Sequence, residues 1–306
     1  MQGLKIYLSL TKFGIVIFVL LVGICAYLVA LPVEFSLWTP HFWQVIGGLY
    51  FLASGSLALN QVQEWKLDQK MHRTRGRPIA SGQLKPLAGG ILAITLIVIG
   101  NHLLLQAHWN SFLWGLATVI LYNGFYTLWW KLRFSFAAVL GAVPGAMPVF
   151  IGYSSFGLSV LEAPVLYMFL LLFLWQMPHF WLLAYRYQED YARAYIPTLP
   201  VTLGKEKTLL QIGMYSLTYM LVASLMPIFV ESSEVFDPFY GFLTVPVILL
   251  GLMLAWNFYR QPSTTRWLWY FMWVNGSILV FFSAIVALRW RLLLSPLKKV
   301  ADFGFF

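Results

Sequence analysis

Three oxygen-bearing side chains follow one another at helical spacing near the end of an apolar segment. Asn60, Glu64 and Asp68 occupy positions i, i+4 and i+8. If a helix continues through them, they lie on one face, within about a quarter of a turn. Magnesium prefers hard oxygen ligands and is commonly held by one or two carboxylates together with substrate phosphate. The spacing indicates a metal site, although a helix end emerging into water would place Glu64 and Asp68 in the same way.

Basic residues follow this acidic face within a few positions. Arg73 and Arg77 present planar guanidinium groups that suit phosphate oxygens. Gly76, Pro78 and Gly82 break the helix and shape the segment into a loop. A cytoplasmic loop of a membrane protein also carries basic residues without any site. The order of acids and then bases favours a site in which the acids hold a metal and the bases neutralise phosphate.

A second polar constellation lies farther along the chain. Gln176 and His179 stand inside an apolar segment, where polar side chains usually face the interior of a helical bundle. Such a histidine is also a common hydrogen-bonded packing residue. Glu189 and Asp190 follow this segment and offer a second pair of carboxylates. They are expected on the same side of the membrane as the first cluster.

The composition shows which solvent surrounds these residues. Of the 306 residues, 60% are hydrophobic and 10% are charged, whereas a soluble domain carries about 25% charged residues. The chain has a formal charge of +9. In a lipid-embedded chain this charge is expected from basic cytoplasmic loops, and nucleic acid is not expected as a partner. Cys25 is the single cysteine, which excludes a disulfide within the chain.

The elements that must position the polar residues are long apolar segments. A transmembrane helix needs about 20 apolar residues. Nine segments qualify, at 12–31, 42–60, 87–107, 111–130, 134–153, 164–184, 208–230, 240–259 and 267–288. The expected fold is all-α, a polytopic bundle of about nine transmembrane helices around a central cavity open to the cytoplasm. The third and fourth segments should form a tight hairpin, and Pro144 and Pro148 should kink or break the fifth.

The distribution of charge predicts the orientation. Lysine and arginine precede the first segment and follow the even-numbered ones, whereas the loops after segments 1, 3, 5 and 7 have neither. Those loops instead hold acidic residues, namely Glu34, Glu162, Glu231, Glu234 and Asp237. The positive-inside rule therefore places the N-terminus and both long polar loops, 61–86 and 185–207, in the cytoplasm. The basic residues of the C-terminal tail disagree, so the tail either follows the headgroups or the helix count is off by one.

Taken by themselves, the residues predict one domain over 1–306 with two carboxylate clusters beside basic residues at the cytoplasmic side. This arrangement fits a magnesium–diphosphate site that serves a lipid-soluble substrate. No Arg/Ser-rich transit peptide is recognised at the start of the sequence. We therefore expect the inner membrane of a bacterial cell as the location.

The order of residues from Asn60 to Pro78, N-x₃-E-x₃-D-x₂-M-x-R-T-x₂-R-P, resembles the first signature of the intramembrane (UbiA-type) prenyltransferase superfamily. The stretches Trp175-Gln-Met-Pro-His-Phe180 and Asp190-Tyr-Ala-Arg-Ala-Tyr-Ile-Pro-Thr-Leu-Pro-Val201 resemble its haem-modifying branch. The resemblance covers roughly residues 55–210, and the rest matches in hydropathy alone. Two positions depart from the superfamily pattern: Glu64 replaces the usual Asp, and Ala194 replaces the second acid of D-x₃-D.

The resemblance implies a reaction and a set of site residues. Farnesyl diphosphate would donate its farnesyl group to a vinyl group of haem b, with addition of water, giving haem O and diphosphate. Magnesium would be held by Asn60, Glu64, Asp68 and Asp190, with Lys131 as a further catalytic residue. The implied substrate-binding residues are Arg73, Arg77, Tyr126, Gln176, His179, Glu189, Tyr191 and Arg193. Candidate protein partners are a terminal oxidase and a haem A synthase.

Three other functions remain open on the sequence. Another prenyltransferase of the superfamily would act on a quinone precursor or a chlorophyllide. A transporter would use intramembrane polar residues and a broken helix, but its site would lie near the middle of the membrane. A non-catalytic assembly factor would hold haem without needing the acidic residues. An assay with haem b, farnesyl diphosphate and magnesium discriminates between them.

Overall fold

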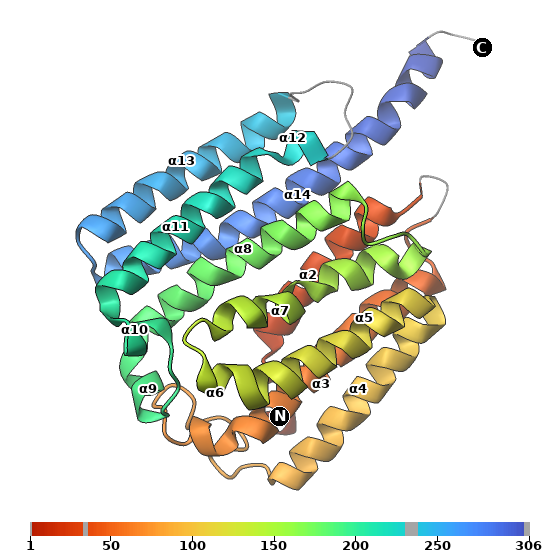
Figure 1. The fold of residues 1–306 in the computed structure, drawn as a ribbon. Coiled ribbons are helices and arrows are strands. Elements are labelled where there is room, and N and C mark those ends of the chain that lie inside the picture. Colours follow the sequence, from red (N-terminus) through yellow and green to blue (C-terminus); the bar gives the residue numbers. More distant parts are fainter. Residues whose placement is uncertain (1, 33–35, 230–237, 303–306) are drawn as a thin grey trace.

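The computed structural model describes residues 2–32, 36–229 and 238–302, and these residues form helices and connecting turns without a strand. Figure 1 shows the long helices lying side by side as one bundle. The helices at the start of the chain are α1 (Gln2–Leu10), α2 (Phe13–Ala30), α3 (Pro40–Asp68), α4 (Pro86–Ala107) and α5 (Trp109–Val119). The middle of the chain forms η1 (Ile120–Trp130), α6 (Lys131–Arg133), α7 (Ala137–Tyr153), η2 (Ser154–Phe156) and α8 (Ala163–Arg186). The remaining helices are α9 (Gln188–Arg193), α10 (Leu199–Thr202), α11 (Gly204–Ser224), α12 (Met226–Phe229), α13 (Pro238–Arg260) and α14 (Thr264–Asp302).

The helices coincide with the apolar segments expected from the sequence. Within the described residues, seven helices are long and apolar enough to cross a membrane. They are α2, α3, α4, α7, α8, α13 and α14. The two other predicted segments are also helical: 111–130 forms α5 followed by η1, and 208–230 falls mainly on α11. The all-α transmembrane fold is therefore confirmed, whereas the count of nine spans exceeds the seven that length and apolarity support.

Local residues define where several helices begin. The Thr39 side chain accepts a hydrogen bond from the backbone N–H of Phe42 and caps α3, whose first residue is Pro40. His108 alone separates α4 from α5, and its Nδ1 accepts a hydrogen bond from the backbone N–H of Asn110. The predicted tight hairpin therefore consists of two helices joined by one residue that caps the second.

Close packing of α3 against α4 depends on small residues. A Cβ on Gly100 of α4 would stand 2.4 Å from the backbone nitrogen of Leu52 in α3. Because that neighbour is backbone, it cannot move aside as a side chain could. The approach fixes the direction of α3, and α3 carries the first polar constellation to its far end.

One end of the bundle gathers the polar elements. Figure 1 shows α6, α9, α10 and the loop after α3 at the same end, with the N-terminus close by. α14 extends beyond the opposite end of its neighbours, and its 39 residues span about 58 Å at 1.5 Å per residue. This length exceeds the hydrocarbon thickness of a bilayer. The C-terminal basic residues therefore belong to a continuation of the last span, up to Asp302.

Two expectations concern α7 and the acidic loops. α7 runs from Ala137 to Tyr153 with Pro144 and Pro148 inside it, so of the expected kink or break, the break does not occur. Of the acidic residues expected outside, Glu162 accepts a hydrogen bond from the Tyr153 hydroxyl at 2.7 Å. The other four, Glu34, Glu231, Glu234 and Asp237, lie outside the described residues.

Candidate active site

The last three turns of α3 carry the predicted metal ligands into a cavity of about 710 Å³. α3 stays helical through Asp68, so Asn60, Glu64 and Asp68 share one face, as their spacing predicts. Their exposed fractions are 3%, 3% and 1%, and all three line the cavity. Because buried carboxylates are costly without partners, their neighbours determine what the site can do.

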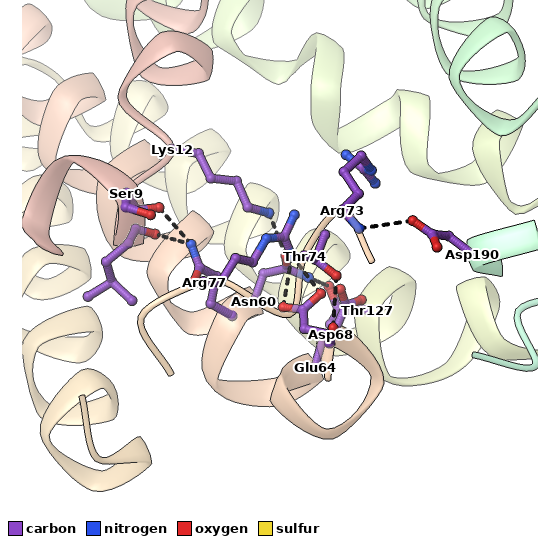
Figure 2. A network of polar contacts seen from close by, with 12 residues as sticks. Ser9, Lys12, Asn60, Glu64, Asp68, Arg73, Thr74, Arg77, Thr127 and Asp190 are labelled. Carbon is purple, nitrogen blue, oxygen red and sulfur yellow. Dashed lines mark hydrogen bonds and ion pairs between the residues drawn. The ribbon is translucent and has the colours of Figure 1, made fainter. Parts of the chain in front are cut away.

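Each of these three oxygen-bearing side chains contacts one basic side chain, and Figure 2 shows the contacts of Asn60 and Asp68. Lys131 Nζ lies 2.7 Å from both carboxylate oxygens of Glu64. Arg77 Nη1 lies 2.7 and 2.8 Å from the two oxygens of Asp68. Lys12 Nζ donates to Asn60 Oδ1 at 2.9 Å. The predicted acids and bases are therefore brought together.

Lys12 belongs to the site, although the sequence predicted only that it marks the cytoplasmic side of the first span. It joins α1 to α2 with a left-handed backbone, at φ 51°, and its side chain lines the cavity. Burial, reinforced by the nearby Arg77, lowers the pKa of Lys12 to about 7. Gln61 fixes this junction, because its Nε2 donates to the carbonyls of Ser9 and Leu10 at 2.8 and 2.9 Å. No pattern in the sequence connects an N-terminal lysine with the end of α3.

The fourth apolar segment changes its winding where it passes the site. Residues 120–130 form a π-helix, η1, directly after α5, and short π-helical stretches are frequent at functional sites. Thr127 accepts a hydrogen bond from Asn60 Nδ2 at 3.2 Å and donates to the carbonyl of Tyr122 at 2.8 Å. Tyr126 stacks on Tyr122 with ring centroids 5.8 Å apart, and both rings line the cavity. Lys131 follows at the end of this helix and reaches Glu64.

The second polar loop is connected to the first through Asp190. Its two carboxylate oxygens each accept one backbone hydrogen bond at 3.0 Å, from the N–H groups of His72 and Arg73, as Figure 2 shows for Arg73. Arg193 also donates to Asp190. Burial works to raise the pKa of Asp190, but the N–H of Arg73, the Arg193 guanidinium and the N–H of His72 outweigh it and hold the pKa below its usual value. The side chain holds the two loops together and does not line the cavity.

The other predicted residues of the second loop divide into two groups. Tyr191 is buried, lines the cavity and accepts a hydrogen bond from Arg73 Nη2 at 3.5 Å. Glu189 and Arg193 are exposed and do not line it. The structure therefore brings ten of the thirteen predicted site residues to one cavity, and Glu189, Asp190 and Arg193 lie outside its lining.

An aromatic stack borders the cavity on the side of α8. His179 lies between Trp175 and Phe271, with ring centroids 4.8 and 5.2 Å apart. Phe18 stacks on the other side of Trp175 at 4.8 Å. Among the residues that the structure describes, none makes a hydrogen bond of good geometry with the buried His179 Nδ1. Because both ring faces are covered, only an edge of this imidazole can face the cavity.

The donor set fits a metal that takes part of its coordination from a ligand. Within the described residues, no group of three or more His, Cys, Asp and Glu side chains is arranged to hold an ion. Glu64, Asp68 and Asn60 instead supply two carboxylates and one amide oxygen. Magnesium is usually held in this way, through one or two carboxylates with waters and substrate phosphates. The residues therefore fit a magnesium ion that is completed by a phosphate-bearing substrate.

Gln176 depends on a glycine of α7. Its Nε2 donates to the carbonyls of Ala142 and Leu172 at 3.0 and 3.3 Å. A Cβ on Gly145 would stand 1.9 Å from Gln176 Oε1. Gly145→Ala is therefore expected to displace this side chain and to lower the free energy of unfolding by about 1–3 kcal/mol. Thermal unfolding in detergent, followed by loss of helical circular dichroism, measures the effect.

Gly124→Ala is the matched control, because a Cβ at Gly124 meets nothing within 4 Å. It should leave the unfolding temperature unchanged or slightly raised, since alanine is the better helix former. Equal losses for Gly124→Ala and Gly145→Ala would show that the contact with Gln176 is not the cause.

Comparison with known proteins defines the class to which this bundle and cavity belong. The model of the UbiA prenyltransferase family matches residues 16–286. The chain belongs to this family. Its curated relatives include the protoheme IX farnesyltransferase of Bdellovibrio bacteriovorus, which is 49% identical over 290 residues, covering 95% of this chain and 98% of the relative. The protoheme IX farnesyltransferase of Flavobacterium johnsoniae is 35% identical over 266 residues, covering 84% and 86%.

Solved structures share the fold at low sequence identity. A structure of digeranylgeranylglyceryl phosphate synthase superposes with a TM-score of 0.72 at 17% identity, covering 94% of this chain and 98% of that one. A UbiA homologue from Archaeoglobus fulgidus bound to GPP and Mg2+ gives a TM-score of 0.67 at 16% identity, covering 92% and 99%. With the apolar helices, these matches show an integral membrane protein of the UbiA fold.

Proposed function

We propose that this protein transfers a farnesyl group from farnesyl diphosphate to a vinyl group of haem b, with addition of water, giving haem O and diphosphate. Two observations support the proposal. The site suits a metal–diphosphate group, and relatives named protoheme IX farnesyltransferase match most of the chain. The observation that carries it is the convergence of two buried carboxylates with Lys131 and Arg77 at one end of a largely apolar cavity.

The proposed binding mode divides the cavity by polarity. Asn60, Glu64 and Asp68 would hold Mg²⁺, which when bound neutralises charge on the diphosphate. Arg73, Arg77 and Lys131 surround the same end and would bind the phosphate oxygens. The farnesyl chain and the porphyrin would occupy the apolar remainder. Tyr126, Gln176 and Tyr191 border this space and would orient the substrates.

The bond changes follow from this arrangement. The allylic C–O bond breaks, and its electron pair leaves with the diphosphate. Arg77 and Lys131 take up the charge that develops there, which is typically the largest catalytic contribution. The vinyl carbon of haem bonds to the allylic carbon, and water supplies hydroxide to the resulting cation and releases a proton. The apolar walls of the cavity limit the access of water to the first cation.

We further propose that His179 binds the iron of the haem substrate. Its ring is clamped between Trp175 and Phe271, and its Nδ1 is buried, so Nε2 is the nitrogen left for the cavity. An iron atom binds imidazole in the plane of the ring, which stacking on both faces leaves accessible.

His179→Ala is expected to weaken binding of ferric haem b by about tenfold or more and to shift its Soret band. Titration of the detergent-solubilised protein with haem measures both, and added imidazole should restore the spectrum. His102→Ala is the control, because His102 is exposed on α4 and bonds only its neighbour Gln106 among the recorded contacts. An unchanged spectrum in His179→Ala would remove this histidine from the haem site.

For Asp190 we propose a positioning role, because its carboxylate binds the backbone at His72 and Arg73. Asp190→Asn should loosen the loop of residues 69–85 and increase its cleavage by trypsin several-fold. The pKa of Asp190 is lowered, so the carboxylate anchors the loop at neutral pH, and this contribution is lost as the pH falls through the lowered value. Glu189→Gln, at the exposed neighbouring position, should leave cleavage unchanged. Equal cleavage of Asp190→Asn and the unaltered protein would contradict the role.

The remaining parts of the proposal concern location and organisation. The chain would form one domain over residues 1–306, of which the family model covers 16–286. It would lie in the bacterial inner membrane with its N-terminus and the site end of the bundle in the cytoplasm, according to the distribution of basic residues. A terminal oxidase or a haem A synthase would receive the product.

The function is tested by product formation. The purified protein is supplied with haem b, farnesyl diphosphate and Mg²⁺, and haem O is detected by mass spectrometry. A parallel reaction offers a quinone precursor in place of haem b. Haem O formation supports the proposal, whereas prenylation of the quinone precursor alone would assign the protein to another branch of the family.

A further inference from the structure

The three side chains proposed to hold the metal are already occupied by the chain's own cations. Lys131 contacts both oxygens of Glu64, and Arg77 contacts both oxygens of Asp68. Lys12 contacts the amide oxygen of Asn60. Figure 2 shows the last two contacts converging on the end of α3. Each oxygen that a metal would need is thus the acceptor of a basic side chain.

This pairing determines how a metal can enter. A dication that arrived alone would have to displace Lys131 and Arg77, and their charges would then lie in a largely apolar cavity without partners. Breaking a buried ion pair by removing one partner is strongly unfavourable. A diphosphate that arrives with the metal provides a new partner for every displaced cation.

The basic side chains are placed to change partners. Lys12, Arg77 and Lys131 all line the cavity, and the side chains of Arg77 and Lys131 keep 20% and 15% of their surface exposed. The carboxylates opposite them are almost fully buried on the rigid α3. Long flexible cations facing fixed acids can turn toward an anion in the cavity while the acids stay in place.

We propose that Lys12, Arg77 and Lys131 exchange partners during substrate binding, from the oxygens of α3 to the oxygens of the diphosphate. The metal then takes the oxygens of α3 that the cations leave. Metal and diphosphate therefore bind as a coupled pair, and neither binds tightly alone. This inference rests on the proposed function and adds Lys12 to the residues that contact the diphosphate.

The test measures metal and diphosphate binding without turnover. Full-length protein in detergent is titrated with Mn²⁺, followed by the electron paramagnetic resonance of the free ion. Binding of radiolabelled inorganic pyrophosphate is measured separately, with and without Mg²⁺. For the unaltered protein, Mn²⁺ alone should bind weakly, and Mg²⁺ should tighten pyrophosphate binding by about tenfold or more.

Lys131→Met should change the two affinities in opposite directions, which a general loss of structure would not do. Removing the cation leaves Glu64 free, so Mn²⁺ alone should bind about tenfold more tightly, while Mg²⁺–pyrophosphate should bind about tenfold more weakly. Lys12→Met is the second variant, and it should weaken Mg²⁺–pyrophosphate binding without weakening Mn²⁺ binding, because it frees the amide oxygen of Asn60. Lys66→Met is the control, because Lys66 is exposed on α3 and pairs with no carboxylate among the described residues. It should change neither affinity.

The outcomes separate this inference from the proposed function. If Lys131→Met weakens both affinities or leaves Mn²⁺ binding unchanged, the exchange of partners is wrong. Tight binding of Mn²⁺ by the unaltered protein without pyrophosphate would also overturn it, even if haem O is formed. Absence of haem O from an unaltered protein that shows the coupled binding would instead overturn the proposed acceptor and leave the exchange supported.

Discussion

Asp68→Asn is expected to lower turnover by about 100- to 1,000-fold. Asp68 is buried at the end of α3, where it is both a proposed metal ligand and the partner of Arg77. The amide keeps the size of the side chain but removes the negative charge that balances the metal. The loss should appear in kcat, because the charge matters most when the C–O bond breaks. Rates of haem O formation at saturating farnesyl diphosphate measure it.

The control for this substitution is Glu162→Gln. Glu162 is also a carboxylate, and it accepts a short hydrogen bond from Tyr153, but it lies at the other end of the bundle and does not line the cavity. Loss of the Glu162 charge should leave turnover within about twofold of the unaltered rate, as is usual for surface changes away from a site. Turnover of Asp68→Asn within tenfold of the unaltered rate, in a protein with normal thermal unfolding, would remove Asp68 from the metal site.

Removal of the metal is expected to have the other large effect. Excess chelator should reduce haem O formation to the detection limit, because Arg77 and Lys131 can turn to the diphosphate only if a metal takes their place beside Asp68 and Glu64. Mg²⁺ added in excess of the chelator should restore the rate. Formation of haem O is followed by mass spectrometry before and after each addition.

Calcium tests whether the geometry of the site matters in addition to its charge. Ca²⁺ takes more ligands at longer distances than Mg²⁺, so it should restore only a small part of the activity. Haem binding followed by the Soret band should persist in the presence of chelator, because the aromatic stack around His179 is separate from the carboxylates. Full activity in excess chelator would show that Lys12, Arg77 and Lys131 suffice without a metal.

The membrane fold was predictable because lipid imposes a simple rule on sequence. A span must satisfy its backbone hydrogen bonds internally and present apolar side chains over about 20 residues. The apolar segments therefore coincide with helices such as α2 and α8. A kink or a break was expected at Pro144 and Pro148, and there is no break, since α7 stays helical with both prolines inside it. Tightly packed helices on either side can hold such a segment in place.

The metal-binding face was also readable from sequence, because Asn60, Glu64 and Asp68 lie on a single helix. Helical periodicity fixes their mutual direction once α3 is known to continue through them. The pairing of particular acids with particular bases did not follow from any spacing. Lys12 and Lys131 stand 48 and 67 positions from their partners, and only packing brings them together.

Asp190 shows most clearly what the tertiary structure decided. A carboxylate in a signature suggested a metal ligand, yet its oxygens are taken by backbone N–H groups of the first loop, 117 and 118 positions away. The sequence by itself determined that lipid surrounds the chain, where the helices lie, and that Asn60, Glu64 and Asp68 share one helical face. These properties depend on local composition and periodicity. The partners of Asp190, Lys12 and His179 were decided by tertiary packing, because a hydrogen bond depends on distance in space and sequence order does not encode that distance.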